Sequence, residues 1–225
     1  MKVLVFDLDD TLYDEKTFVM SGFRAVSDYL QSNFNIPKEE SFGLMVEDLK
    51  ENGRGHIFDN ILNRYNIHSK SSVKKCVSIY RTHQPTISLD PEADNCLSKF
   101  NIYPIYIVTD GNKMVQYNKL KALGLHERVR FCFITHRYGL CHAKPSPYCF
   151  NKICHMEKVD PTQVVYIGDN PKKDFIGIKP LGFKTIRVKK GDYADLTLSP
   201  EYEAHYTIHS LSELTDDLLK ELSRI

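Results

Sequence analysis

Three carboxylates fall within four consecutive positions near the start of the chain, in the stretch VFDLDDTLYD. Asp7 and Asp9 lie two residues apart, so on an extended chain both side chains would point the same way, roughly 6–7 Å apart. Like charges this close are tolerated when a divalent cation neutralises them, and Mg²⁺ prefers oxygen ligands. Asp169 and Asp174, in GDNPKKD, offer further carboxylate oxygens. We therefore expect a magnesium site; the simpler alternative is that the aspartates only cap turns and helix starts.

Two further stretches carry groups suited to binding an anion such as phosphate. Lys144, in HAKPSPYCF, precedes two prolines that suit a helix start, so its ammonium would lie at the end of a loop. In VTDGN, Thr109 supplies a hydroxyl, and Asp110 and Gly111 supply backbone N–H groups at a strand-to-helix turn. The alternatives are an ordinary solvated lysine and a common Asp-Gly turn.

Short apolar segments that alternate with helical patterns must position these residues. The expected strands are residues 2–7, 102–108, 130–134, 163–167, 183–188 and 205–208, and the helices between and after them are 112–123, 146–156, 172–181 and 211–223. Apolar strands in alternation with helices are typical of an α/β fold with a parallel sheet covered on both faces. Ligands bind such sheets at the carboxyl ends of the strands, where Asp7, Thr109 and Asp169 are expected.

Residues 15–100 interrupt this alternation and contain no convincing strand. Helical patterns are expected there at residues 16–33, 38–52, 56–65, 71–82 and 91–100. A block of this length is far longer than an ordinary connection between strands. We expect an inserted helical domain at 15–100 and a core domain formed by 1–14 and 101–225.

The composition limits the class of protein. A net charge of +1 and a pI of about 7.6 give no general attraction to nucleic acid or to an anionic membrane, and no apolar run approaches the roughly 20 residues of a membrane span. Six irregularly spaced cysteines favour a cytoplasmic protein with reduced thiols over a disulfide scaffold. The group around Cys149 and Cys154 lacks the tight pairs of a zinc site.

Taken together, these stretches resemble the motifs of a known family. The stretches FDLDDTL, VTDGN, AKPSPYCF and YIGDNPKKDF resemble, in order and spacing, the four motifs of the haloacid dehalogenase superfamily. The resemblance implies a Rossmann-like core with an inserted all-helical cap of the C1 type. Within the superfamily, the chain looks most like the small-metabolite phosphatases, including N-acylneuraminate 9-phosphatase and nucleotidase-like members.

The resemblance also implies roles for the motif residues. Asp7 would be the nucleophile that forms an aspartyl-phosphate, and Asp9 the general acid and base. Members that cleave carbon–halogen bonds lack this acid, so its presence favours phosphate esters. Lys144 would join them in catalysis by offsetting charge. Phosphate binding is expected from Thr109, Asp110, Gly111 and Lys144, and Mg²⁺ binding from Asp7, the carbonyl of Asp9, and Asp169. Thr11 and Asp174 are expected to support the site.

The helical cap is expected to select the substrate. The stretch NGRGHIF offers Arg54 and His56 as candidate contacts, with Arg54 able to hold a second anionic group. Tyr13 is a further candidate, expected to line the entrance beside the cap hinge. The alternative is that NGRGHIF is a plain surface turn and that Tyr13 belongs only to the hinge.

The predicted function is therefore a Mg²⁺-dependent phosphatase of a small phosphorylated metabolite, either a sugar phosphate or a nucleoside monophosphate. A phosphomutase on the same core is the closest alternative, and a non-catalytic binding protein that retains the fold is a further one. We expect a monomer or homodimer with no nucleic-acid or membrane partner.

Overall fold

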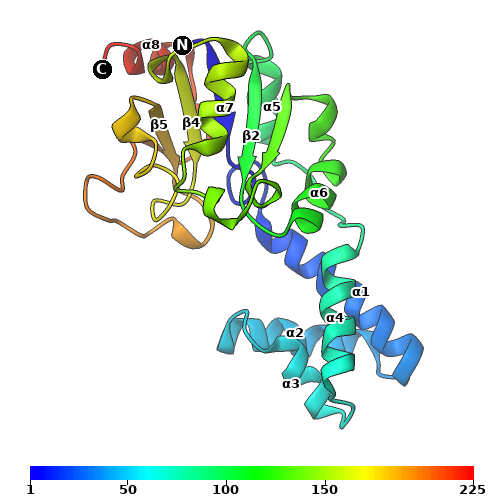
Figure 1. Cartoon of the computed structure of the whole chain (residues 1–225). Helices are drawn as coiled ribbons and strands as arrows, with labels where there is room; N and C mark the ends of the chain where they lie inside the picture. Colours follow the sequence, from blue (N-terminus) through cyan, green and yellow to red (C-terminus); the bar gives the residue numbers. More distant parts are fainter. The chain divides into compact units, whose positions relative to one another are not determined.

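The computed structural model describes all 225 residues and contains one parallel sheet of six strands. The strands lie in the order β3-β2-β1-β4-β5-β6. Figure 1 labels β2, β4 and β5 in this sheet. Their bounds are β1 Val3–Phe6, β2 Ile105–Thr109, β3 Phe131–Ile134, β4 Val164–Gly168, β5 Lys184–Val188 and β6 Tyr206–Ile208. Each was expected from an apolar segment, and the predicted α/β, Rossmann-like fold is confirmed.

The first strand lies in the interior of the sheet, which explains its composition. Every residue of β1 is buried, and the strand pairs in parallel with β2 on one side and with β4 on the other. Val3 and Val5 face the layer that contains α7 (Tyr148–Glu157), which contributes Cys149 and Phe150 to the same hydrophobic cluster. A strand buried on both faces needs apolar side chains at every position, not only at alternate ones.

Eight α-helices accompany the sheet. Besides α7 they are α1 Glu15–Phe34, α2 Lys38–Asn52, α3 Ile57–Arg64, α4 Lys70–Thr82, α5 Pro91–Lys99, α6 Lys113–Ala122 and α8 Asp216–Leu222. Their bounds lie within a few residues of those expected, except that the predicted helix 211–223 divides into a 3₁₀ turn, Leu211–Glu213, and α8. No helix combines the length and the apolar character needed to cross a bilayer.

The expected helix at 172–181 is not formed, and that prediction was wrong. The segment folds into successive turns, and only Lys179–Leu181 forms a 3₁₀ helix. At Gly177 the backbone approaches the carbonyl oxygen of Pro145 so closely that a Cβ atom would lie 1.7 Å from it. Pro180 adds a position that lacks a backbone donor. Close contact with another segment therefore overrides the local helical pattern.

The chain divides into two compact units, Met1–Glu15 with Ser88–Ile225, and Lys16–Ile87. We call them the core unit and the helical unit. The helical unit ends at residue 87 and not at residue 100 as predicted, because residues 88–100 pack with the core unit. Asp90 donates its backbone N–H to the Leu12 carbonyl at 3.0 Å, and Lys190 binds Glu92 at 2.8 Å.

The helical unit has a hydrophobic interior of its own. Helix α1 buries Val19, Phe23, Val26 and Leu30, which recur at the helical spacing of three or four residues. They pack in one cluster with residues of α2, α3 and α4. A capping box between Ser69 and Ser72 fixes the start of α4.

Candidate active site

The carboxyl ends of three neighbouring strands deliver the predicted site residues to one rim of the sheet. Asp7 follows β1, Thr109 ends β2 and Asp169 follows β4, and β1 lies between the other two strands. The sheet therefore brings together side chains that lie more than 160 positions apart in the sequence, as the rule for open parallel sheets predicts.

Lys144 joins two of these carboxylates. Its Nζ lies 2.8 Å from Oδ1 of Asp7 and 2.8 Å from Oδ1 of Asp174. The lysine side chain is only 1% exposed, so both ion pairs are shielded from water. Burial opposes its charge, but the carboxylates of Asp174 and Asp7 outweigh burial and raise the pKa of Lys144 well above its usual value. The ammonium is thus a fixed positive charge beside Asp7.

The carboxylates still outnumber the cations that touch them. Oxygens of Asp7, Asp169 and Asp174 lie within 4.8 Å of one another, and all three residues are buried. Burial, together with the charges of Asp174 and Asp7, raises the pKa of Asp169 to about 9. Burial likewise raises the pKa of Asp7 to about 6, against the opposing effect of Lys144.

The Asp169 carboxyl group is buried among those of Asp7 and Asp174, and Lys144 only partly offsets the negative charge that it would carry when ionised. A buried set of carboxylate oxygens with too little positive charge beside it suits a hard divalent cation such as Mg²⁺. The donor set therefore fits the predicted metal, and Asp7, Asp169 and Asp174 are the side chains that the structure gathers for it.

The Asp9 side chain does not belong to this group, in contrast to the extended-chain argument from spacing. The chain turns directly after β1, with the Leu12 N–H bonded to the Leu8 carbonyl at 3.0 Å. The Asp9 carboxylate instead accepts hydrogen bonds from Tyr13, Gln116 and Lys119. Burial acts to raise the pKa of Asp9, but the charge and hydrogen bonds of Lys119, together with Tyr13 and Gln116, lower it below its usual value.

The VTDGN stretch forms the turn expected of it. The φ angle of Gly111 is +135°, a conformation that side chains other than hydrogen disfavour. The buried Thr109 hydroxyl accepts from Gln116 at 2.6 Å, which leaves its own hydrogen available to a phosphoryl oxygen. The Asp110 carboxylate accepts from the Thr135 hydroxyl at 2.6 Å and from the Lys144 backbone N–H at 3.1 Å. The negative charge of the Asp110 carboxylate would repel phosphate, so only the backbone N–H of Asp110 is suited to phosphate binding.

Other predicted and unpredicted residues complete the surroundings. Thr11 is fully buried, and its hydroxyl oxygen has no hydrogen-bond partner. Tyr13, expected at an entrance, is also fully buried and donates to Asp9 at 2.6 Å. Tyr166 was missed by the sequence analysis: its hydroxyl accepts from Lys144 at 2.9 Å and donates to Asp174 at 3.1 Å. A tyrosine within an apolar strand was the available signal, because a buried hydroxyl needs a partner.

Arg54 and His56 belong to the helical unit. His56 precedes the first residue of α3, and both residues are exposed. Arg54 lines a hollow of about 350 Å³ whose other walls include Phe58, Tyr80 and Arg81. Asp59 lines the same hollow, so its two arginines are accompanied by a carboxylate as well as by aromatic rings.

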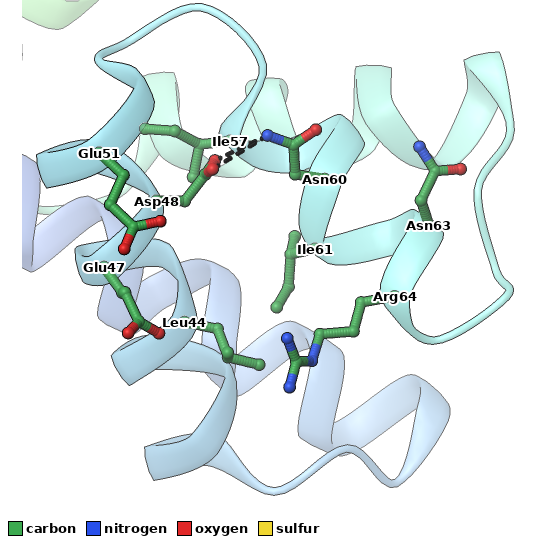
Figure 2. A pocket seen from close by; sticks show the side chains of 9 residues that line it. All are labelled: Leu44, Glu47, Asp48, Glu51, Ile57, Asn60, Ile61, Asn63 and Arg64. Atoms are coloured by element: carbon green, nitrogen blue, oxygen red, sulfur yellow. Dashed lines mark hydrogen bonds between the residues drawn. The ribbon is translucent and has the colours of Figure 1, made fainter.

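A second hollow of the helical unit, of about 480 Å³, has the opposite charge. Figure 2 shows Glu47, Asp48 and Glu51 of α2 on one wall and Asn60 and Arg64 of α3 on the other. Asp48 accepts two hydrogen bonds of 3.0 Å from Asn60, which joins the two helices. Because three carboxylates line one wall, this hollow is unsuited to a phosphorylated ligand.

Comparison with known proteins agrees with this geometry. A family model described as haloacid dehalogenase-like hydrolase matches residues 1–182. The chain belongs to this family. It is 32% identical to a glyceraldehyde 3-phosphate phosphatase of Methanocaldococcus jannaschii, over 100% of this chain and 99% of that protein. A glyceraldehyde 3-phosphate phosphatase of Pyrococcus furiosus is 28% identical, over 98% of this chain and 94% of that protein.

A solved structure supports the fold. The 2-haloacid dehalogenase of Pseudomonas syringae superposes with a TM-score of 0.65 at 22% identity, over 100% of this chain and 99% of that one. The predicted family and fold are thus confirmed, and the curated relatives confirm the predicted enzyme class, a phosphoric monoester hydrolase of the haloacid dehalogenase-like family. The roles of individual residues stay predictions.

Proposed function

We propose that this haloacid dehalogenase-like hydrolase is a Mg²⁺-dependent phosphatase of a short sugar phosphate and that it acts through an aspartyl-phosphate on Asp7. The observation that carries the proposal is the placement of the Asp7 carboxylate, which lies 2.8 Å from the buried Lys144 ammonium and beside Asp169 and Asp174. A carboxylate held by a fixed cation in a shielded pocket can approach an anionic phosphoryl group.

In the first half of the reaction, an Asp7 oxygen attacks phosphorus while the bond from phosphorus to the leaving oxygen breaks. Asp9, in its protonated form, gives its proton to that oxygen, which departs as an alcohol. In the second half, Asp9 takes a proton from water, whose oxygen attacks phosphorus and releases inorganic phosphate and the free Asp7 carboxylate. Thr109 and the Gly111 backbone would donate hydrogen bonds to the phosphoryl oxygens.

The metal would be held by the side chains of Asp7 and Asp169 and by the Asp9 carbonyl, with Asp174 and Thr11 supporting the site. Bound there, Mg²⁺ would neutralise negative charge on the carboxylates and on the phosphoryl oxygens. Asp174 also binds Lys144 and accepts the Asn170 backbone N–H at 2.9 Å, so it fixes the loop that carries Asp169.

The curated relatives support a three-carbon substrate over a nucleoside monophosphate. They are named glyceraldehyde 3-phosphate phosphatases and align with nearly the whole chain. Glyceraldehyde 3-phosphate carries no anionic group besides its phosphate, so it offers nothing for Arg54 to bind as a second anion. We therefore propose the helical unit as the cap that encloses the substrate, without a carboxylate-selecting role for Arg54.

The test is release of inorganic phosphate from glyceraldehyde 3-phosphate, 3-phosphoglycerate and a nucleoside monophosphate, each with Mg²⁺ and with EDTA. We expect glyceraldehyde 3-phosphate to be hydrolysed fastest and EDTA to abolish turnover. Asp7→Asn should lose at least 10³-fold in kcat. Preference for 3-phosphoglycerate would instead restore Arg54 as a selector of carboxylates, and full activity of Asp7→Asn would refute the nucleophile.

We further propose a reducing, cytoplasmic setting for the enzyme. All six cysteines are free thiols, and four of them are buried without a disulfide partner. Chromatography with light scattering would decide between the proposed monomer and homodimer.

A further inference from the structure

Three donors hold the Asp9 carboxylate on both of its oxygens. Tyr13 Oη and Lys119 Nζ donate to Oδ1 at 2.6 and 2.7 Å, and Gln116 Nε2 donates to Oδ2 at 2.8 Å. The three donor residues are buried, with Gln116 and Lys119 each only 2% exposed. The Asp9 side chain itself keeps 22% of its surface exposed, so it is fixed in direction and still reachable.

Gln116 and Lys119 come from a single element of the core unit. They lie three residues apart on α6, which places both on the same face of the helix. An ammonium is rarely buried without a partner, and here Asp9 at 2.7 Å and Glu15 at 3.4 Å provide carboxylates. The burial of Lys119 thus depends on the acids that it contacts.

Gln116 links Asp9 to the phosphate-binding turn. Its Nε2 also donates to the Thr109 hydroxyl oxygen at 2.6 Å, so both amide hydrogens are used. The Gln116 side chain also lies against Gly111, where a Cβ atom would come within 3.3 Å of it. One side chain therefore sets the spacing between the proposed acid and the residues proposed to bind the phosphoryl group.

We propose that Lys119 and Gln116 are positioning residues that aim the Asp9 carboxylate at the leaving oxygen of the substrate. This inference rests on the proposed function, in which Asp9 protonates the leaving alcohol. Neither residue touches the reacting atoms; each acts through Asp9. Once either donor is removed, the Asp9 side chain can rotate away from the leaving oxygen, and proton transfer becomes slower.

The dependence of rate on the leaving group tests this role. An alkoxide needs a proton to depart, whereas p-nitrophenolate leaves without one. We expect Lys119→Met to lower kcat/KM for glyceraldehyde 3-phosphate by about 10- to 100-fold but for p-nitrophenyl phosphate by less than about 3-fold. Gln116→Met, which also removes the hydrogen bond to Thr109, should lower kcat/KM for both substrates, with a loss about 10-fold larger for glyceraldehyde 3-phosphate. Asp9→Asn should show the same pattern as Lys119→Met with a larger loss. Lys121→Met, at an exposed lysine of α6, should leave both rates unchanged.

A double substitution separates positioning through Asp9 from a general structural effect. In the Asp9→Asn background, Lys119→Met should cause little further loss, because the group that it aims is already gone. Equal losses on both substrates, or full additivity with Asp9→Asn, would overturn the inference while leaving the proposed function intact. If Asp9→Asn itself shows no dependence on the leaving group, the proposed role of Asp9 fails first. Should Lys119→Met fold poorly, the ratio of the losses on the two substrates in Gln116→Met provides the test, because the loss through Thr109 is common to both substrates.

Discussion

The raised pKa of the buried Asp169 carboxyl group leads to a prediction that runs against the usual effect of mutating a buried polar residue. In metal-free protein at pH 7, Asp169→Asn should raise the free energy of unfolding. The substitution preserves shape and removes one of three crowded acids, whose oxygens lie within 4.8 Å of one another. It also supplies amide hydrogens that can donate to the neighbouring carboxylates.

The raised pKa of Asp169 sets the size of the expected gain in the free energy of unfolding. Burial and the charges of Asp174 and Asp7 raise the pKa of Asp169 from 3.8 to about 9. A raised pKa means that folding disfavours the ionised form, so the cost is absent below pH 3.8 and grows as the pH rises toward 9. From pH 3.8 to pH 7, at 1.36 kcal/mol per unit, the ceiling is about 4 kcal/mol. Water penetration and relaxation reduce it, so we expect the variant to gain about 2 kcal/mol.

The assay is urea denaturation in EDTA at pH 7 and pH 5, with and without Mg²⁺. The advantage of Asp169→Asn should shrink to about a third at pH 5, where less of the cost has developed. Mg²⁺ should stabilise the wild type more than the variant, because the ion binds the folded acidic group. Asp195→Asn, at an exposed aspartate, serves as the control. A variant less stable than the wild type in EDTA at pH 7 would refute the reasoning.

Two further substitutions test the packing of the core unit. Gly177→Ala should destabilise the protein by about 1–3 kcal/mol in urea denaturation, because its Cβ would collide with the Pro145 carbonyl, whereas Gly43→Ala, with open space at its Cβ on α2, should be neutral or stabilising. Equal effects at the two glycines would contradict the close contact. Glu203→Gln should cost about 2–3 kcal/mol, because it leaves the buried Arg187 without its counter-charge at 2.8 Å. Adding Arg187→Met should recover part of that loss, and further destabilisation would show that the ion pair is not the cause.

The sequence pattern predicted the sheet well, for a physical reason. A strand buried on both faces needs mainly apolar residues, and β1, β2 and β4 have no exposed residue, with the polar Thr109 only at the carboxyl end of β2. The same pattern failed at 172–181, where helical periodicity is present but Gly177 must approach Pro145. That contact joins segments about 30 residues apart, so local helix propensity cannot predict it.

The site residues likewise fall into those that the local sequence could predict and those that depend on contacts between distant segments. Asp7, Asp169 and Lys144 were accessible to sequence reasoning because each follows or precedes a recognisable element and carries chemistry of its own. Gln116 and Lys119 were not, because their significance depends on which loop α6 packs against. Their spacing gave a usable signal: a glutamine and a lysine on one helical face, beside the buried Leu120, need buried partners.

The crowded carboxylates of the first loop are held apart by two separate lysines. Asp7 is bound by Lys144, which arrives from the loop before α7, and Asp9 by Lys119, which arrives from α6. Both lysines are buried, so each acts on its own aspartate with little screening by water. Burial raises the pKa of Asp7 to about 6 despite Lys144, whereas at Asp9 the effect of burial is outweighed by Lys119, Tyr13 and Gln116, which lower the pKa. Two like residues only two positions apart therefore lie in separate ion-pair networks. The proposed roles, Asp7 as nucleophile and metal ligand and Asp9 as proton donor to the leaving group, rest on this geometry and not on the direction of the pKa shifts.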